Sequence, residues 1–199
     1  MIDINNAWEE LKRRVEKCEN CELCKTRNNT VFGEGLQTGC RVVMIGEAPG
    51  EDEDIQGRPF VGKAGQKLTD IIEKGGNIKR SSIYIMNTIK CRPPNNRNPL
   101  KSEILACREF LEAQLLLLNP KIIVTLGNIP KNALLNNETV GITKLRGKWQ
   151  KFRGIDLLPM YHPSYIIRSE GTSDEAKIKI DTWNDIKSLR SKMKEYNLI

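Results

Sequence analysis

The chain has 199 residues, of which 39% are apolar and 29% are charged, a composition that suits one well-buried domain and excludes a disordered protein. Its 32 basic and 25 acidic residues leave a net charge of +7, which weakly favours a polyanionic partner. No apolar run approaches the roughly 20 residues of a membrane span, and the first residues lack the layout of a signal peptide. We therefore expect a cytoplasmic protein that does not bind membranes. Its length suggests a single domain over residues 1–199.

The first predicted helix, residues 6–16, leads into a cluster of cysteines. Two overlapping C-x-x-C pairs lie within residues 18–24, and each places two soft ligands on one turn, as zinc and iron–sulfur sites require. Six cysteines in a cytosolic chain favour metal ligation or redox chemistry over disulfides. Spacing alone allows either pair, with further ligands from Cys40, Cys91 or Cys107. We expect Cys40 to be a buried apolar residue, because it lies directly before a core strand.

Residues 46–65 follow the β-branched strand 41–45 and predict a shaped pocket. Five glycines and two prolines fix turns there, and they present several acidic side chains and one aromatic ring. Ligands of α/β proteins bind where buried strands end. The alternative is a solvated connection between strand and helix. A phosphate loop is disfavoured, because the acids would repel a phosphate and the pattern Gly-x-x-x-x-Gly-Lys-Ser/Thr is absent.

The rest of the chain alternates strands and helices, which predicts an α/β fold. Strands are expected at 82–86, 121–126 and 155–161, in addition to 41–45. Helices are expected around 68–72, 100–118, 130–135 and 178–196, the last packing through Ile180, Trp183, Ile186 and Leu189.

Two polar residues stand at the ends of predicted core strands. Asn87 ends one strand, where a turn-capping role is the alternative to ligand recognition. His162 is the only histidine and follows the last strand, directly before Pro163; most isolated histidines are structural or surface residues. Residues 91–99 form a rigid polar loop that carries two arginines. The loop 143–149 is basic, and a hairpin with solvated lysines is the alternative there.

Taken together, these motifs resemble those of the iron–sulfur (family-four) uracil-DNA glycosylases over residues 10–190. The matching segments are C-x-x-C at 18–21, VFGEG at 31–35, GEAPG at 46–50, GRPFVG at 57–62, NTIKCRPP at 87–94 and HPS at 162–164. The resemblance implies a three-layer αβα domain with a four-stranded parallel sheet. It also implies a [4Fe–4S] cluster on Cys18, Cys21, Cys91 and Cys107, and the choice of Cys21 over Cys24 depends on the resemblance alone.

The activity implied by the resemblance is hydrolysis of the N-glycosidic bond of a uracil flipped out of DNA, with uracil and an abasic site as products. Phe60 would stack on the base, Asn87 would read its Watson–Crick edge, and His162 would stabilise negative charge on the departing uracil. Related enzymes carry an aspartate where this chain has Ala48, another expected substrate contact. Glu47 and Glu53 are therefore the candidates for positioning water, and Glu53 could equally exclude the methyl group of thymine.

The implied partner is uracil-containing DNA, single- or double-stranded, bound by a monomer. The candidate phosphate and backbone contacts are Arg92, Arg97, Lys144, Arg146, Lys148, Ser164 and Arg168. Tyr165 and Ile166, with Ile167, would wedge into the base stack. One rival is a non-catalytic nucleic-acid-binding module stabilised by zinc or an iron–sulfur cluster. Another is an electron-transfer protein, whose ferredoxin-type ligands would lie closer together in sequence.

Overall fold

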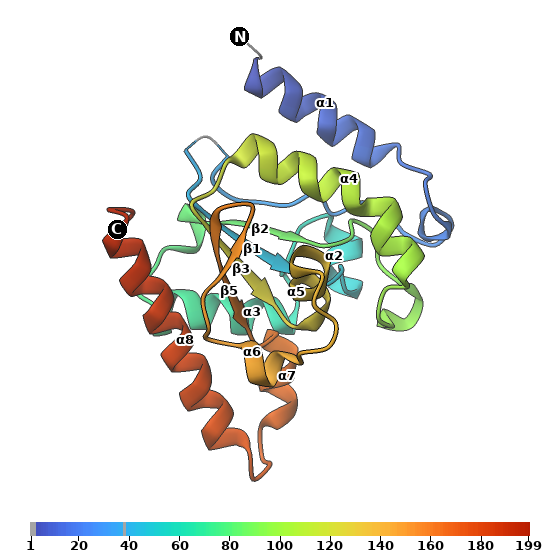
Figure 1. Cartoon of the computed structure of the whole chain (residues 1–199). Helices are drawn as coiled ribbons and strands as arrows, with labels where there is room; N and C mark the ends of the chain where they lie inside the picture. Colours follow the sequence, from blue (N-terminus) through green and yellow to red (C-terminus); the bar gives the residue numbers. More distant parts are fainter. Residues whose placement is uncertain (1–2, 38) are drawn as a thin grey trace.

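A mostly parallel sheet of five strands runs through the centre of the computed structural model, which describes residues 3–37 and 39–199 (Figure 1). Met1 and Ile2, on which part of the signal-peptide expectation rests, lie outside the described residues. The strand order is β2-β1-β3-β5-β4, and only β4 runs antiparallel to its neighbour. The strands are β1 (Val42–Gly46), β2 (Tyr84–Asn87), β3 (Ile122–Leu126), β4 (Gln150–Phe152) and β5 (Ile155–Met160).

Helices cover both faces of this sheet, as Figure 1 shows with α1 and α4 on one side and α3 and α8 on the other. The main helices are α1 (Ile4–Glu16), α2 (Glu51–Gln56), α3 (Lys63–Asp70), α4 (Lys101–Leu118), α5 (Asn128–Leu135), α6 (Ile142–Leu145), α7 (Pro163–Ser169) and α8 (Glu175–Glu195). Shorter turns are η1 (Glu22–Lys25), the π-helical η2 (Ile71–Gly75), η3 (Arg80–Ser82) and η4 (Pro94–Asn96). No helix of the described residues combines the length and apolar character needed to cross a membrane.

Side chains that alternate between the two faces of the central strands form the two halves of the hydrophobic core. In β1, Val43 and Ile45 pack with α1 and α4, whereas Val42 and Met44 pack with α3, η2 and α8. Every residue of β1 is buried, because helices cover both faces of the strand. The predicted three-layer αβα fold is confirmed.

The predicted strand count of four is corrected to five by β4. This strand of three residues pairs with β5 through a two-residue turn. Arg153 and Gly154 in that turn have φ angles of 48° and 84°, the left-handed conformation that tight hairpin turns require. So short a strand, with Lys151 at its centre, shows no hydrophobic alternation in the sequence. At the opposite edge of the sheet, Glu34 forms an isolated antiparallel bridge with Ile85 of β2.

The buried face of α8 also differs from the prediction. Ile186 and Leu189 are buried as expected, but Ile180 and Trp183 are 60% and 45% exposed. The buried face instead includes the polar residues Thr182 and Asp185, together with Ile178 and Met193. Selecting apolar positions alone therefore assigned the wrong face to the first half of this helix.

Candidate functional site

The carboxyl ends of the four parallel strands border one pocket of about 650 Å³. Strand β1 delivers Glu47 and Ala48, β2 ends on Asn87, and the segment after β5 delivers His162. The structure brings most of the predicted site together, since this pocket is lined by Glu47, Ala48, Glu53, Phe60, Asn87, Arg97, His162, Ser164, Tyr165 and Arg168.

Phe60 and Asn87 meet above Gly46 at the floor of the pocket. A Cβ atom on Gly46 would lie 2.4 Å from Asn87 Oδ1 and 2.5 Å from Phe60 Cζ, so only glycine leaves room for both side chains. Phe60 has a φ angle of 53°, a left-handed conformation that costs a non-glycine residue about 1–2 kcal/mol. Asn87 is 1% exposed, and its Oδ1 has no hydrogen-bond partner among the described residues. This oxygen is therefore available to accept a hydrogen bond from a ligand.

His162 caps the N-terminus of α7 and keeps a neutral ring. Its Nδ1 accepts a hydrogen bond from the Ser164 backbone N–H at 3.2 Å and lies 2.7 Å from Ser164 Oγ. Burial, with a smaller contribution from the charge of Arg168, lowers the pKa of His162 to about 4. Because Nδ1 is an acceptor, the proton of the neutral ring resides on Nε2. The side chain is thus an uncharged donor, and its ring centroid lies 5.9 Å from that of Phe60.

The two candidate carboxylates differ in what they contact. Glu53 is 9% exposed; its Oε1 accepts from the N–H groups of Val61 and Gly62, both at 2.9 Å, and its Oε2 accepts from that of Gly50 at 3.0 Å. Oε1 therefore holds the loop around Phe60, and Oε2 holds the N-terminus of α2. Glu47 is half-buried at the pocket, where burial raises its pKa and Arg168 lowers it to a lesser extent.

The predicted DNA contacts divide into surface and internal side chains. Lys144, Lys148 and Arg168 are exposed, and Ser164 and Tyr165 are half-buried beside the pocket.

Arg146 and Ile166, by contrast, are directed into the protein. Arg146 is 15% exposed; its Nε donates to Asp185 Oδ2 at 2.7 Å, and its Nη1 pairs with Asp181 at 3.0 Å. Ile166 is 3% exposed and packs with Tyr161 and Ile178. Both side chains hold helices together in the free chain, and their contact with DNA stays a prediction.

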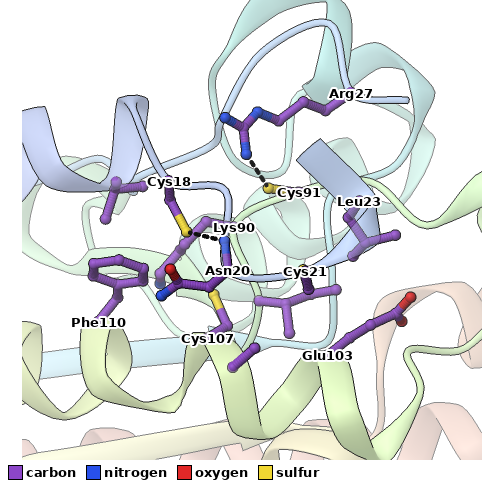
Figure 2. A pocket seen from close by; sticks show the side chains of 13 residues that line it. Cys18, Asn20, Cys21, Leu23, Arg27, Lys90, Cys91, Glu103, Cys107 and Phe110 are labelled. Carbon is purple, nitrogen blue, oxygen red and sulfur yellow. Dashed lines mark hydrogen bonds between the residues drawn. The ribbon is translucent and has the colours of Figure 1, made fainter. Parts of the chain in front are cut away.

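Four cysteines from three separate segments line a second, small cavity, shown in Figure 2. These are Cys18, Cys21, Cys91 and Cys107. Two N–H donors are directed at their sulfur atoms: Arg27 Nη1 lies 3.2 Å from Cys91 Sγ, and the Asn20 backbone nitrogen lies 3.5 Å from Cys18 Sγ. Burial raises the pKa of Cys107 to about 12, and it also raises those of Cys21 and Cys91.

The chemistry of this donor set fits an iron–sulfur cluster, since soft sulfur ligands from several segments are accompanied by N–H donors to sulfur. Among the described residues, no group of three or more His, Cys, Asp or Glu side chains is arranged to hold a metal ion. Cys24 is half-buried and is not among the residues that line the cavity. Cys40 is fully buried in the core, with its Sγ 3.2 Å from Val42 O, which confirms its prediction as an apolar residue.

The sequence analysis missed the pocket residues contributed by β3. Gly127, Asn128 and Ile129 follow this strand and line the pocket. Gly127 has a φ angle of 94°, and a Cβ atom there would lie 3.2 Å from His162 Cβ. A glycine at the carboxyl end of a buried strand, as at Gly46, was the available signal.

The fold and pocket define an α/β protein with its pocket at the carboxyl edge of a parallel sheet, where proteins of this class bind their ligands. Residues 32–187 match the family model of the uracil DNA glycosylase superfamily. The chain is 44% identical over 173 residues to the type-4 uracil-DNA glycosylase of Thermotoga maritima, covering 85% of this chain and 88% of that protein. It is 39% identical over 200 aligned positions to the type-4 enzyme of Sulfurisphaera tokodaii, covering 97% and 89%. The chain belongs to the uracil DNA glycosylase superfamily, as its motifs predicted.

Proposed function

We propose that this protein is a DNA-repair enzyme that hydrolyses the N-glycosidic bond of uracil flipped out of DNA, releasing uracil and leaving an abasic site. One observation carries the proposal: Asn87 Oδ1, which has no hydrogen-bond partner among the described residues, lies buried beside the Phe60 ring, in a pocket that also holds the neutral donor His162. The two relatives named above are both type-4 uracil-DNA glycosylases, and their names support the same substrate.

Asn87 would recognise uracil by its hydrogen-bonding edge. Its Oδ1 can accept from N3–H while its amide nitrogen donates to O4. Cytosine presents the reverse pattern, with an acceptor at N3 and a donor at N4, so it would leave buried polar groups unpaired. The Phe60 ring would stack on the face of the base.

His162 and Glu47 would divide the chemistry of bond cleavage. Negative charge develops on the departing uracil, and the Nε2–H of His162 would stabilise this charge at O2. The neutral ring supports this role, because the low pKa of His162 keeps it an uncharged donor. Glu47 would orient and deprotonate the attacking water. Its raised pKa makes it a stronger base than a solvated glutamate, whereas both oxygens of Glu53 are engaged by backbone N–H groups of the Phe60 loop and of Gly50.

We further propose that Cys18, Cys21, Cys91 and Cys107 hold a [4Fe–4S] cluster, which would supply a structural cross-link. The four side chains come from the segment after α1, the loop after β2, and α4. The N–H donors of Arg27 and Asn20 support the assignment, because such donors stabilise the negative charge of cluster sulfur ligands. The cluster would thereby fix the loop that follows Asn87.

DNA would lie across the mouth of the pocket, with Lys144, Lys148 and Arg168 as exposed phosphate contacts and Tyr165 beside the emptied base position. The rival function, that of a non-catalytic nucleic-acid-binding module, does not explain the arrangement of Asn87, Phe60 and His162.

The test is incubation of the purified holoprotein with an oligonucleotide that contains one uracil, followed by alkaline cleavage at abasic sites. Strand scission at the uracil is expected, with none at cytosine or thymine in matched oligonucleotides. Binding of the uracil oligonucleotide without any alkali-labile site would instead favour the non-catalytic module.

A further inference from the structure

The backbone at Phe60 is held from both sides by charged side chains of opposite sign. We propose that Arg80, together with Glu53, is a positioning residue that locks the Phe60 ring in its base-stacking orientation. This inference rests on the proposed function, because it assigns the ring the task of stacking on uracil.

Arg80 holds the carbonyl side of the Phe60 turn. Its Nη2 donates to the backbone oxygens of Pro59 and Phe60 at 3.0 and 3.2 Å, and its Nη1 donates to Thr69 Oγ1 at 2.9 Å. Thr69 Oγ1 in turn donates to Gly65 O at 3.0 Å, so the guanidinium is fixed to α3. Arg80 is half-buried and is not among the residues that line the pocket, so we expect it to act on the substrate through the backbone that it holds.

Glu53 holds the amide side of the same turn. Its Oε1 accepts from the N–H groups of Val61 and Gly62, the two residues that follow Phe60. Gly65 completes the enclosure, since a Cβ atom at this position would lie 1.8 Å from Phe60 O. The peptide groups on both sides of Phe60 are therefore fixed by charge-assisted hydrogen bonds.

This double restraint explains why Phe60 keeps a left-handed backbone with a φ angle of 53°. A strained conformation of a bulky residue persists only where the surroundings over-determine it, and such residues cluster at functional sites. Without the Arg80 contacts, the backbone would relax toward an ordinary φ angle. The ring would then leave its place above Gly46 and beside Asn87, and the slot for the base would no longer be preformed.

A double-mutant cycle of Arg80→Met and Phe60→Ala tests the proposal, with single-turnover excision of uracil and inhibition by free uracil as the measurements. If Arg80 acts through the ring, Arg80→Met is expected to lower the rate about tenfold in the Phe60 background, which corresponds to about 1.4 kcal/mol. In the Phe60→Ala background its effect should fall below twofold. Free uracil should inhibit Arg80→Met more weakly than wild type, and Arg80→Lys, which can still reach one carbonyl, should recover part of the loss.

Lys79→Met is the matched control, because it removes an exposed positive charge from the adjacent residue. It should keep wild-type rates and uracil inhibition. Melting temperatures of all variants separate loss of fold from loss of positioning, and Thr69→Val, which removes one acceptor of the guanidinium, replaces Arg80→Met if that variant does not fold.

A tenfold loss in both backgrounds, or wild-type behaviour of Arg80→Met, would overturn the positioning role while leaving the proposed function intact. A wild-type chain that leaves uracil in DNA would reject the proposed function, and this role with it.

Discussion

Replacing Asn87 with alanine should separate the activity of this protein from its stability. Asn87 is 1% exposed, and its Oδ1 has no partner within residues 3–37 and 39–199, so the folded chain carries the desolvation cost of this oxygen without a compensating hydrogen bond. In the bound state the same amide would pair with N3–H and O4 of uracil. The substitution therefore removes a group that would contribute to binding of the substrate but lowers the stability of the free protein.

The expected loss of activity follows from the two uracil groups left unpaired. Each costs about 1–3 kcal/mol, so kcat/KM should fall by about thirtyfold to more than 10⁴-fold. The free energy of unfolding should stay unchanged or rise by about 1 kcal/mol. Removing the buried oxygen removes its desolvation cost, and this gain offsets the packing lost with a small side chain. A gain of that size raises Tm by about 2–4 °C.

The assay pairs single-turnover excision kinetics with thermal denaturation of the same holoprotein preparations. Asn132→Ala is the matched control, since Asn132 Oδ1 is also buried with no partner in the described part of the chain, but its side chain lines a different cavity, between α4 and α5. That variant should share the stability effect and keep full activity. Wild-type kcat/KM in Asn87→Ala, or a Tm lowered by more than about 5 °C, would refute the reasoning.

Three further predictions concern the other groups of the site. Cys107→Ala should lose its iron, its visible absorbance and part of its stability, whereas Cys24→Ser should retain all three. Iron loss in Cys24→Ser would show that the wrong C-x-x-C pair was chosen. His162→Ala should bind uracil-containing DNA but cleave it about 10²–10³-fold more slowly, with partial recovery in His162→Gln, and a wild-type single-turnover rate would make His162 structural. Because burial raises the pKa of Glu47, the rate should fall as pH decreases through a value above the ordinary 4.5 of a glutamate, and Glu47→Gln should be slow with no such decrease.

The pocket could be predicted from the sequence because its main residues follow strands that are strongly apolar. Gly46, Asn87 and His162 each stand within or directly after such a strand, and parallel strands bring their carboxyl ends to one edge. The recognised motifs then supplied the roles. Gly127 obeys the same rule after β3 but belongs to none of those motifs, and it was missed.

What the sequence could not predict depends on partners that are remote along the chain. Arg146 was expected at the DNA, but it pairs with Asp181 and Asp185 on α8, at least 35 residues away. Nothing in the local pattern distinguishes a lysine or arginine that faces solvent from one that joins two helices. Glu53 presents the same difficulty, since its role as a loop anchor depends on which backbone N–H groups the turn at Phe60 directs toward it.

The bridge between Glu34 and Ile85 has a consequence for how this protein behaves among copies of itself. The outer edge of a sheet carries unpaired N–H and C=O groups that can recruit a strand from another molecule. Here Glu34 exchanges hydrogen bonds of 2.9 and 2.8 Å with Ile85 and thereby blocks the edge of β2. Gly35 permits this approach, because a Cβ atom there would lie 2.0 Å from Ile83 O. At the far edge, β4 is three residues long and carries the exposed Lys151, so neither border of the sheet offers a long template for aggregation.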